Sequence, residues 1–522
     1  MNFNSFNFLC FAAVFLPIYY LIPRKKQWIS LLCASWLFYL AAGVRYLFFI
    51  LLTTLTCWAA ARLMGRRLQE QDAYLKAHKG ELSLAERGQY KAGIKKRNRR
   101  WLIACLTVNF AVLALCKVSL AEPVRSLMVG TQLSLLTLGL PLGISFYMFQ
   151  ATGYLFDVYR GKAEPEENLF RFSLFISFFP QLIQGPISKF NQLAPHLAEP
   201  HSFDSRQVSF GLQRVLLGYF KKLVIADRMA PAVLALRDPQ YGGTGFLLLT
   251  LFYAVQIYGD FTGGIDVAIG LGQMMGIPMA ENFRHPFFSK NIAEYWRRWH
   301  ITLGEWMKDY IFYPLSVSKP LMKLSRFGRK HLGSFGKRLP VYVASVATWF
   351  VTGIWHGVTP NFVLWGMMNC FVIIVSQELT PLYAKFHGRY HLNERRWYDG
   401  FQILRMFLLM NFIRACDLFP HVGDYFRGFG SILWNPNLSI LWDGTLMTLG
   451  LTGLDWGIVM GGMALLFTIS VLEVKHGSVR AMLDDIHPLL RYLILFPLLL
   501  VVLLMGRYGV GYNASSFIYN QF

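Results

Sequence analysis

The sequence predicts an all-α polytopic membrane protein, and three observations support this fold class. Hydrophobic residues make up 54% of the 522 residues, and the mean hydropathy is +0.38. Apolar runs long enough to cross a bilayer recur along the whole chain. Lys and Arg number 51 against 29 Asp and Glu, and many of them gather between apolar runs. These features exclude a multidomain soluble protein, and positive cytoplasmic loops explain the basic excess without nucleic acid.

We predict roughly 11–13 transmembrane helices with additional re-entrant or interfacial helices, because several runs are short or interrupted by Pro, Gly or Asp. The first run lacks a basic n-region and a small-residue cleavage site, so we expect a helix and not a cleaved signal. The predicted spans are Phe8–Ile22, Trp28–Leu40, Tyr46–Ala61, Trp101–Leu115, Leu133–Phe156, Leu169–Leu182, Val208–Leu236, Phe246–Met274, Val341–Trp355, Phe362–Val375, Leu404–Ile413, Trp456–Val471 and Leu489–Met505.

Basic segments predict the orientation of these spans. Arg62–Arg100 and Lys319–Arg338 are rich in Lys and Arg, which favours the cytoplasmic side, as does the milder Lys475–Arg491. Counting spans from these segments places both the N-terminus and the C-terminus outside the cytoplasm. Both termini outside requires an even number of crossings, so at least one predicted run is re-entrant or interfacial.

Motifs for common cofactors are missing from the sequence. It contains no Walker loop, no HExxH and no GxGxxG at a strand-to-helix turn. Seven cysteines are scattered without a CxxC pair, and most lie in apolar runs, where they pack as small apolar residues. We therefore predict no metal site and no permanently bound cofactor.

Polar residues interrupt the apolar pattern in the middle of the chain. The run Tyr258–Asp266 holds two carboxylates and several glycines, so we expect a broken helix closed by hydrogen bonds from Asp260 and Asp266. The segment Glu294–Leu315 is too charged to cross lipid but rich in Trp and Tyr, which is typical of an interfacial helix. That interpretation leaves open a cytoplasmic site lined by His300 and its neighbours.

His356 is the most informative single residue, because it lies between Trp355 and Gly357 at the end of one apolar run and before another. An ionisable ring at membrane depth suggests a functional site. A histidine hydrogen-bonded to a neighbouring helix is the alternative, and position alone does not decide between them.

The chain resembles the membrane-bound O-acyltransferases, and it is most similar to the bacterial branch that acetylates alginate and related polymers. Ordered motifs make this resemblance specific, where any one of them would be weak. They are Pro141–Tyr147, Phe156–Gly161, Phe178–Ile187, Phe220–Arg228, Tyr258–Asp266, Glu281–Phe283, Trp296–Leu303, Trp355–Gly357, Leu364–Gly366 and the terminal Phe517–Phe522.

The resemblance implies a single integral membrane domain over residues 1–522, in which a helical ring encloses a funnel. Within it we expect N-terminal helices at 1–140 with a basic loop at 62–100, a catalytic core at 141–380 and C-terminal helices and tail at 381–522. The family's characteristic histidine corresponds to His356, and its second polar position corresponds to His300. Asn369 stands where relatives often carry another histidine, which puts in doubt any scheme that needs a third imidazole.

The residue types suggest acyl transfer from a thioester. His356 would act as the base, because an imidazole pKa lies near the working pH. Arg297 and Arg298 would attract the phosphates of the donor, acetyl-coenzyme A or an acyl carrier thioester, although anchoring at the cytoplasmic surface explains them equally well. The predicted donor-binding or substrate-binding residues are Arg297, Arg298, Trp299, Trp355, Asn361 and Asn369.

Tyr519 completes the predicted catalytic set with His356 and His300. It follows the last span, and its phenol could carry the acyl group as an activated ester on the outer side. A tyrosine of the interfacial aromatic belt is the alternative.

The predicted function is O-acetylation of an extracytoplasmic polysaccharide from the bacterial cytoplasmic membrane. An extracytoplasmic SGNH-type acetyltransferase would be the partner and would hand the group to the polysaccharide acceptor, while the lipid bilayer surrounds the chain. Two alternatives remain open, namely D-alanyl transfer to teichoic acid and a non-catalytic polysaccharide or lipid transporter.

Overall fold

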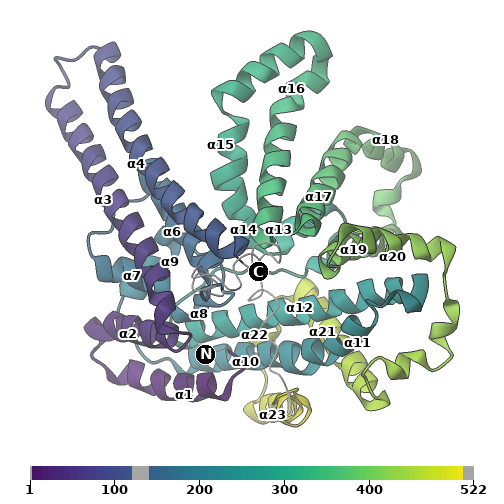
Figure 1. Cartoon of the computed structure of the whole chain (residues 1–522). Coiled ribbons are helices and arrows are strands. Elements are labelled where there is room, and N and C mark those ends of the chain that lie inside the picture. The colour runs from purple at the N-terminus through teal and green to yellow at the C-terminus, as the bar shows by residue number, and fades with distance from the viewer. Residues whose placement is uncertain (1–2, 120–139, 509–522) are drawn as a thin grey trace, which may run out of the picture. The chain divides into compact units, whose positions relative to one another are not determined.

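The computed structural model describes residues 3–119 and 140–508, and it is helical almost throughout (Figure 1). Its only β pairing in the described residues is an isolated antiparallel bridge between Phe283 and Trp299. The chain divides into two compact units, Met1–Ser209 with Leu271–Ala280, and Phe210–Gly270 with Glu281–Phe522. The all-α prediction is therefore confirmed.

The first unit is built on a long helical pair. Helices α3 and α4 lie side by side, and the turn between them begins at His78 and ends at Ser83, whose side chain forms a capping box with Glu86. The segment that we expected to be a basic loop, Arg62–Arg100, is thus mostly helical. The helices of this unit are α1 Phe6–Leu21, α2 Gln27–Leu40, α3 Leu47–Ala77, α4 Leu84–Val118, α6 Ile144–Tyr159, α7 Leu169–Ser177, α8 Phe179–Leu182 and α9 Phe190–Ala198, with 3-10 turns η1 Arg24–Lys26 and η2 Val44–Tyr46.

The second unit holds the remaining helices. Helix α10 begins, and helix α12 ends, in residues of the first unit. The elements are α10 Ser205–Tyr219, the π-helix η4 Phe220–Ala226, α11 Asp227–Ala235, η5 Pro239–Tyr241, α12 Gly242–Met274, η6 Pro286–Phe288, α13 Ile292–Arg298, α14 Ile301–Met307, the π-helix η7 Lys308–Phe312, α15 Tyr313–Ser316, α16 Lys319–His356, α17 Pro360–Glu378, α18 Thr380–Tyr390, η8 Leu392–Glu394, α19 Arg396–Ala415, η9 Cys416–Leu418, α20 Val422–Trp434, η10 Leu438–Leu441, η11 Thr445–Thr448, α21 Gly453–His476, α22 Val479–Asp485 and α23 Pro488–Met505.

Six helices in the described residues are long and apolar enough to cross a membrane. They lie at Val44–Ala77, Leu84–Val118, Pro239–Met274, Pro360–Glu378, Gly453–His476 and Pro488–Met505. The predicted spans Phe8–Ile22 and Trp28–Leu40 fall on the shorter helices α1 and α2, Val341–Trp355 and Leu404–Ile413 lie within α16 and α19, and Leu169–Leu182 and Val208–Leu236 are each divided among successive elements. The first part of the predicted span Leu133–Phe156, residues 133–139, lies outside the described residues. The protein is a multi-pass membrane protein, while the total of roughly 11–13 spans stays a prediction.

The predicted break at Tyr258–Asp266 is wrong, because α12 runs through it without interruption. Its glycines serve close packing instead: a Cβ atom at Gly259 would lie 2.7 Å from the carbonyl oxygen of Lys221, and one at Gly263 would lie 2.7 Å from that of Gly218. Small residues allow helix backbones to approach in this way. The glycines therefore bring α12 against α10 and η4.

The carboxylates of α12 are neutralised by lysines of η4. Lys222 Nζ lies 2.6 Å from Asp260 Oδ1 and 2.8 Å from Asp227 Oδ1, and all three side chains are buried. Paired charges are the form in which ionisable groups are tolerated inside such a protein. Asp260 is therefore structural, as expected, but it joins two helices rather than closing a broken one.

A helical hairpin leads to His356. Gly333 interrupts α16 with φ 56° and ψ −130°, a left-handed region that favours glycine, and the two arms are drawn side by side in Figure 1. Gly328 and Gly336 meet where the arms leave the turn, since a Cβ atom at Gly336 would clash with the Gly328 carbonyl. The predicted basic loop Lys319–Arg338 is thus mostly helical, because it covers the first arm of α16, the turn at Gly333 and the start of the second arm, which ends at His356.

Candidate active site

His356 is the last residue of α16 and is held by the contact between α16 and α17. A Cβ atom at Gly353 would lie 2.6 Å from the Phe362 carbonyl oxygen, and one at Gly366 would lie 2.5 Å from that of Trp349. The missing side chains let the two backbones approach closely. His356 is 7% exposed, and the centroid of its imidazole lies 4.9 Å from that of the Trp355 ring and 4.8 Å from that of the Trp365 ring.

His300 is positioned by its backbone and by Asn282. Its φ of 48° lies in the left-handed region, which is uncommon for a residue with a side chain, and it immediately precedes α14. The peptide N–H of Ile301 donates to the Asn282 carbonyl at 3.0 Å, next to the bridge between Phe283 and Trp299. These backbone contacts fix the direction in which the ring points.

The Asn282 side chain selects the tautomer of His300. Its Oδ1 accepts from the Thr302 peptide N–H at 3.0 Å and from the Thr302 hydroxyl at 2.9 Å, which identifies this atom as the oxygen. His300 Nδ1 lies 3.3 Å from the same oxygen, and Nδ1 must carry the proton for that contact to be a hydrogen bond. A neutral His300 therefore presents the lone pair of Nε2.

Burial keeps His300 neutral. It lowers the pKa of the ring from 6.5 to about 3, and the nearby positive charge of Arg414 contributes in the same direction. His300 is thus neutral at pH 7 and suited to accept a hydrogen bond, but poorly suited to take a proton.

Trp355 joins the two histidines into one site. Its ring lies 6.1 Å from the His300 ring and 4.9 Å from the His356 ring, with near edge-on geometry in both pairs. We call His300 and His356 the imidazole pair. The structure therefore brings together three residues that lie in two separate sequence motifs.

Asn369 and Asn361 hold neighbouring structure. Asn369 Oδ1 accepts from Trp296 Nε1 at 3.3 Å, and its Nδ2 donates to the Trp365 carbonyl at 2.8 Å. Asn361 Nδ2 donates to the carbonyls of Cys416 and Phe419 at 3.0 and 2.8 Å. Asn369 thus orients Trp296 and Trp365, which we call the aromatic wall beside His356. A direct contact of either amide with substrate stays a prediction.

The predicted donor-binding residues of α13 have different environments. Arg297 is exposed, while Arg298 is half-buried and paired with Glu294 at 2.6 Å. Trp299 is 1% exposed, so its side chain lies inside the protein, next to His300 in the chain. The arrangement leaves Arg297 as the more accessible of the two predicted arginines.

Sequence reasoning missed two charged residues at and just after the end of α19, Arg414 and Asp417. The Arg414 guanidinium lies 4.3 Å from the Trp299 ring centroid, and its Nη2 lies 3.5 Å from the Tyr295 hydroxyl. Asp417 follows in η9, where burial raises the pKa of its carboxyl to about 6 against the opposing effect of Arg414. The available signal was an arginine directly after the apolar run Leu404–Ile413.

The predicted relay at Tyr519 and the prediction of no metal site both stay predictions. Tyr519 lies outside the described residues. Among residues 3–119 and 140–508, no group of three His, Cys, Asp or Glu side chains is arranged to hold a metal ion.

Comparison with known proteins gives a family match over the region that contains the imidazole pair. The family described as "MBOAT, membrane-bound O-acyltransferase family" matches residues 166–416. A probable alginate O-acetylase of Azotobacter vinelandii is 33% identical over 388 residues, covering 72% of this chain and 68% of that protein.

More distant relatives carry related names. A peptidoglycan O-acetyltransferase of Helicobacter pylori is 30% identical over 327 residues, covering 55% of this chain and 57% of that protein. A teichoic acid D-alanyltransferase of Bacillus subtilis is 26% identical over 270 residues, covering 49% of this chain and 63% of that protein. The names of these relatives all describe acyl transfer, with alginate, peptidoglycan or teichoic acid named in each case.

Proposed function

Because this chain belongs to the membrane-bound O-acyltransferase family and is an acyltransferase, we propose that it moves an acetyl group across the membrane. The donor is a cytoplasmic thioester, most simply acetyl-coenzyme A, and the final acceptor is an extracytoplasmic polysaccharide of the alginate, cellulose or peptidoglycan type. The observation that carries the proposal is the imidazole pair, since both rings are buried and both contact the Trp355 ring.

The chemistry assigns different tasks to the two histidines. The acceptor hydroxyl oxygen attacks the thioester carbonyl carbon while His356 takes the hydroxyl proton. The thioester C–S bond then breaks, while the new C–O bond to the acceptor oxygen is kept. The proton passes from the His356 imidazolium to the departing thiolate sulfur. His300 stays neutral and accepts a hydrogen bond at Nε2, which orients the hydroxyl without competing for its proton.

In this proposal, the donor binds at the cytoplasmic side of the site. Arg297 is exposed and can pair with a phosphate of the donor, whereas Arg298 already pairs with Glu294. Trp299, Trp355 and the aromatic wall held by Asn369 exclude water from the thioester. An Arg297→Gln enzyme should show a raised KM for the donor with little change in kcat.

We also propose that Tyr519 relays the group on the outer side. Its phenol oxygen would form an aryl ester, and an SGNH-type partner would move the acetyl group from that ester to the polysaccharide. Mass spectrometry of the C-terminal peptide tests the relay. An acetyl group on Tyr519 that is lost in His356→Ala supports it, and an unmodified Tyr519 in the active wild-type protein contradicts it.

D-alanyl transfer is the second candidate, and the Bacillus subtilis relative supports it. The two functions differ in the donor, so purified protein in proteoliposomes can be offered acetyl-coenzyme A or a D-alanyl carrier protein. Consumption of the first and not of the second supports acetylation. The reverse result keeps the acyltransferase assignment and moves the proposed substrate to teichoic acid.

A further inference from the structure

A pocket between α17, α18 and α19 in the second unit is separate from the imidazole pair. Its volume is about 510 Å³, within the range of small-ligand sites, and residues 290–293 complete its lining. We call it the α19 pocket. None of the residues that we predicted to be catalytic or donor-binding lines it.

Polar and apolar side chains gather at opposite ends of the α19 pocket. Helices α17 and α19 both line it and run antiparallel, because Asn361 at the start of α17 donates to the carbonyl of Cys416, just after the end of α19. Polar lining residues come late in α17 and early in α19, so they share one end, and the apolar ones share the other. The polar residues are Ser376, Gln377, Gln402 and Arg405, and the apolar ones are Phe371, Val372, Val375, Met406 and Leu409.

The polar end carries a positive charge that no carboxylate offsets. Arg405 donates from Nη2 to the Lys290 carbonyl at 3.1 Å, which uses one of its five N–H groups. Lys290 Nζ pairs with Asp399 at 2.7 Å, and Asp399 does not line the pocket. Within residues 3–119 and 140–508, no carboxylate pairs with Arg405, and no Asp or Glu lines the pocket. An anionic group at this end would offset the charge and accept charge-assisted hydrogen bonds.

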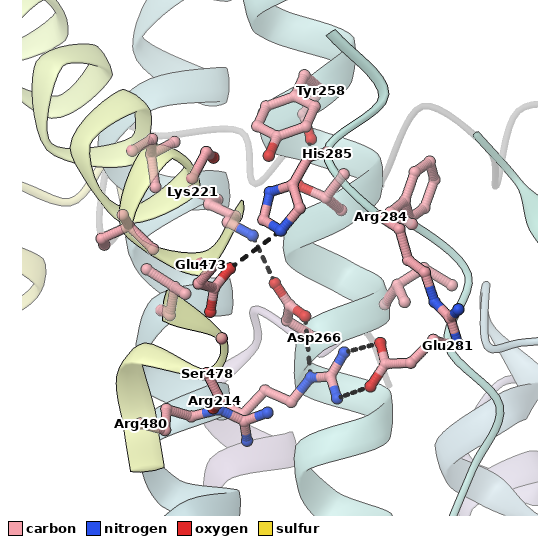
Figure 2. Close-up of a pocket in the computed structure, with 18 residues that line it drawn as sticks. Arg214, Lys221, Tyr258, Asp266, Glu281, Arg284, His285, Glu473, Ser478 and Arg480 are labelled. Atoms are coloured by element: carbon pink, nitrogen blue, oxygen red, sulfur yellow. Dashed lines mark hydrogen bonds and ion pairs between the residues drawn. The ribbon is translucent and has the colours of Figure 1, made fainter. Parts of the chain in front are cut away.

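The pocket shown in Figure 2 has a different charge pattern. There, both terminal nitrogens of Arg214 donate to the Glu281 carboxylate, each at 2.6 Å, and Lys221 Nζ donates to Asp266 at 2.7 Å. These two cations are neutralised by side chains of the protein itself. The α19 pocket, where Arg405 keeps its charge, is therefore the better candidate for an anionic ligand.

The apolar end of the α19 pocket belongs to the outward surface of a membrane helix. Helix α17 is long and apolar enough to cross a membrane, and only 33% of its most apolar window is buried within the protein. Phe371, at the apolar end of the pocket, is 67% exposed. A ligand that fills the whole pocket therefore needs an apolar part beside its anionic group, as a phospholipid has.

The polar end is predicted to face the cytoplasm. Arg338 Nη2 lies 2.6 Å from Glu378 Oε2 at the last residue of α17, and Arg338 closes the basic segment Lys319–Arg338. Arg395 and Arg396 stand at the start of α19, at the same end of the pocket. Clustered Lys and Arg favour the cytoplasmic side, where they attract anionic lipid head groups.

We propose that the α19 pocket binds an anionic phospholipid of the cytoplasmic leaflet, with the head group at Arg405 and an acyl chain between α17 and α19. Two independent observations support this ligand: the guanidinium without a carboxylate partner, and the change from polar to apolar lining along both helices. The inference does not rest on the proposed acetyl transfer, because no residue assigned to that reaction lines the pocket.

Native mass spectrometry of the purified full-length protein tests the proposal. Each protein is mixed with equal amounts of phosphatidylglycerol and phosphatidylcholine that carry the same acyl chains. Arg405→Gln removes the charge at the polar end, and Arg389→Gln is its matched control, because Arg389 is exposed on α18 and does not line the pocket. Val372→Trp fills the apolar end, and Leu404→Trp is its control, because Leu404 is 56% exposed and does not line the pocket.

The proposal predicts that wild type and both controls retain phosphatidylglycerol roughly fivefold more than phosphatidylcholine. Arg405→Gln should lose that preference, and Val372→Trp should lose the retained lipid. Equal retention of the two lipids by wild type, or an unchanged preference in Arg405→Gln, would overturn the proposal. Arg405 is exposed, so the result for Arg405→Gln decides even if Val372→Trp fails to fold, and its thermal transition should match wild type.

The need for an acyl chain is tested by competition. Glycerol 3-phosphate offers the anionic phosphate without the chains. An excess of it should leave the retained phosphatidylglycerol in place. Displacement of the lipid by this soluble ester would contradict the role of the apolar end.

Discussion

At the scale of single residues, the site depends on how the two imidazoles differ. His300 is held by Asn282 in one tautomer and kept neutral by burial, while His356 ends a helix between two indole rings. Our proposal that His356 is the base and His300 a hydrogen-bond acceptor is based on this difference. The residues that create it, Asn282 and Arg414, are also the ones to which sequence reasoning assigned no role.

Asn282→Asp should make acyl transfer more sensitive to acid. A carboxylate at this position favours imidazolium, so the pKa of His300 rises from its depressed value and the ring protonates at a higher pH. Since protonation removes the Nε2 lone pair, the acidic limb of the pH–rate profile should shift to higher pH. Asn291→Asp is the control, because Asn291 is an exposed helix cap and Asp also caps helices.

The same histidine links folding to pH. The pKa of His300 is lowered from 6.5 to about 3 in the folded protein, so as the pH falls the unfolded chain takes up this proton before the folded protein does. Its contribution to stability is present above pH 6.5 and declines as the pH falls toward 3. A pH profile for Asn282→Asp that coincides with wild type would contradict the proposed role of Asn282.

At the scale of elements, glycines and buried ion pairs set the helix contacts that support the site. Gly353 and Gly366 bring α16 against α17, and Gly259 and Gly263 bring α12 against α10 and η4. In the sequence, the glycines of Tyr258–Asp266 predict a broken helix, and only the tertiary structure shows that they allow close helix packing. Likewise, no local pattern shows that Lys222 lies against Asp260, 38 positions away.

Gly353→Ala should destabilise the protein and reduce acyl transfer together. The new methyl group would lie 2.6 Å from the Phe362 carbonyl oxygen, so α16 and α17 must separate and His356 must shift. Overpacking of this kind costs about 1–3 kcal/mol. Gly457→Ala in α21 is the control, because a Cβ atom there meets no neighbouring atom within 4 Å. Thermal unfolding in detergent and initial rates measure both effects, and an unchanged Gly353→Ala protein would contradict this account of the contact.

Lys222→Met should be among the most destabilising substitutions. It leaves the buried carboxylates of Asp260 and Asp227 without the ammonium group that lies 2.6 and 2.8 Å from them. Removing one partner of a buried ion pair costs about 3–5 kcal/mol. Lys475→Met is the comparison, since Lys475 is exposed. A melting temperature equal to that of the comparison protein would show that the pairing contributes little.

At the scale of the whole molecule, hydropathy was sufficient to predict the fold class and ordered motifs were sufficient to predict the family, while the catalytic roles of the two histidines stay predictions. It was insufficient for the helix boundaries in Leu169–Leu182 and Val208–Leu236, where tertiary packing divides one apolar run into several elements. The contact between Asn282 and Thr302 depends on an antiparallel bridge that no local periodicity predicts. The pocket lined by Arg214, Glu281 and Glu473 likewise combines segments that are far apart in the chain.

The orientation of the molecule can be tested with single cysteines. The distribution of Lys and Arg predicts that the hairpin tip near Gly333 faces the cytoplasm, as does the turn between α3 and α4 near Gly80. In a cysteine-free background, Gly80→Cys should react with a membrane-impermeant maleimide only after the membrane is opened. Labelling of this position in intact cells would reverse the predicted topology, including the extracytoplasmic termini.

The most direct test of the account compares His356→Ala with His331→Ala in proteoliposomes supplied with labelled acetyl-coenzyme A. Both histidines belong to α16, but His331 is exposed near the hairpin tip and His356 is buried beside Trp355 and Trp365. We predict that His356→Ala lowers the rate of acyl transfer at least roughly 100-fold, with an unchanged thermal transition, while His331→Ala retains wild-type activity. Equal activity in the two variants would contradict the claim that His356 is the catalytic base.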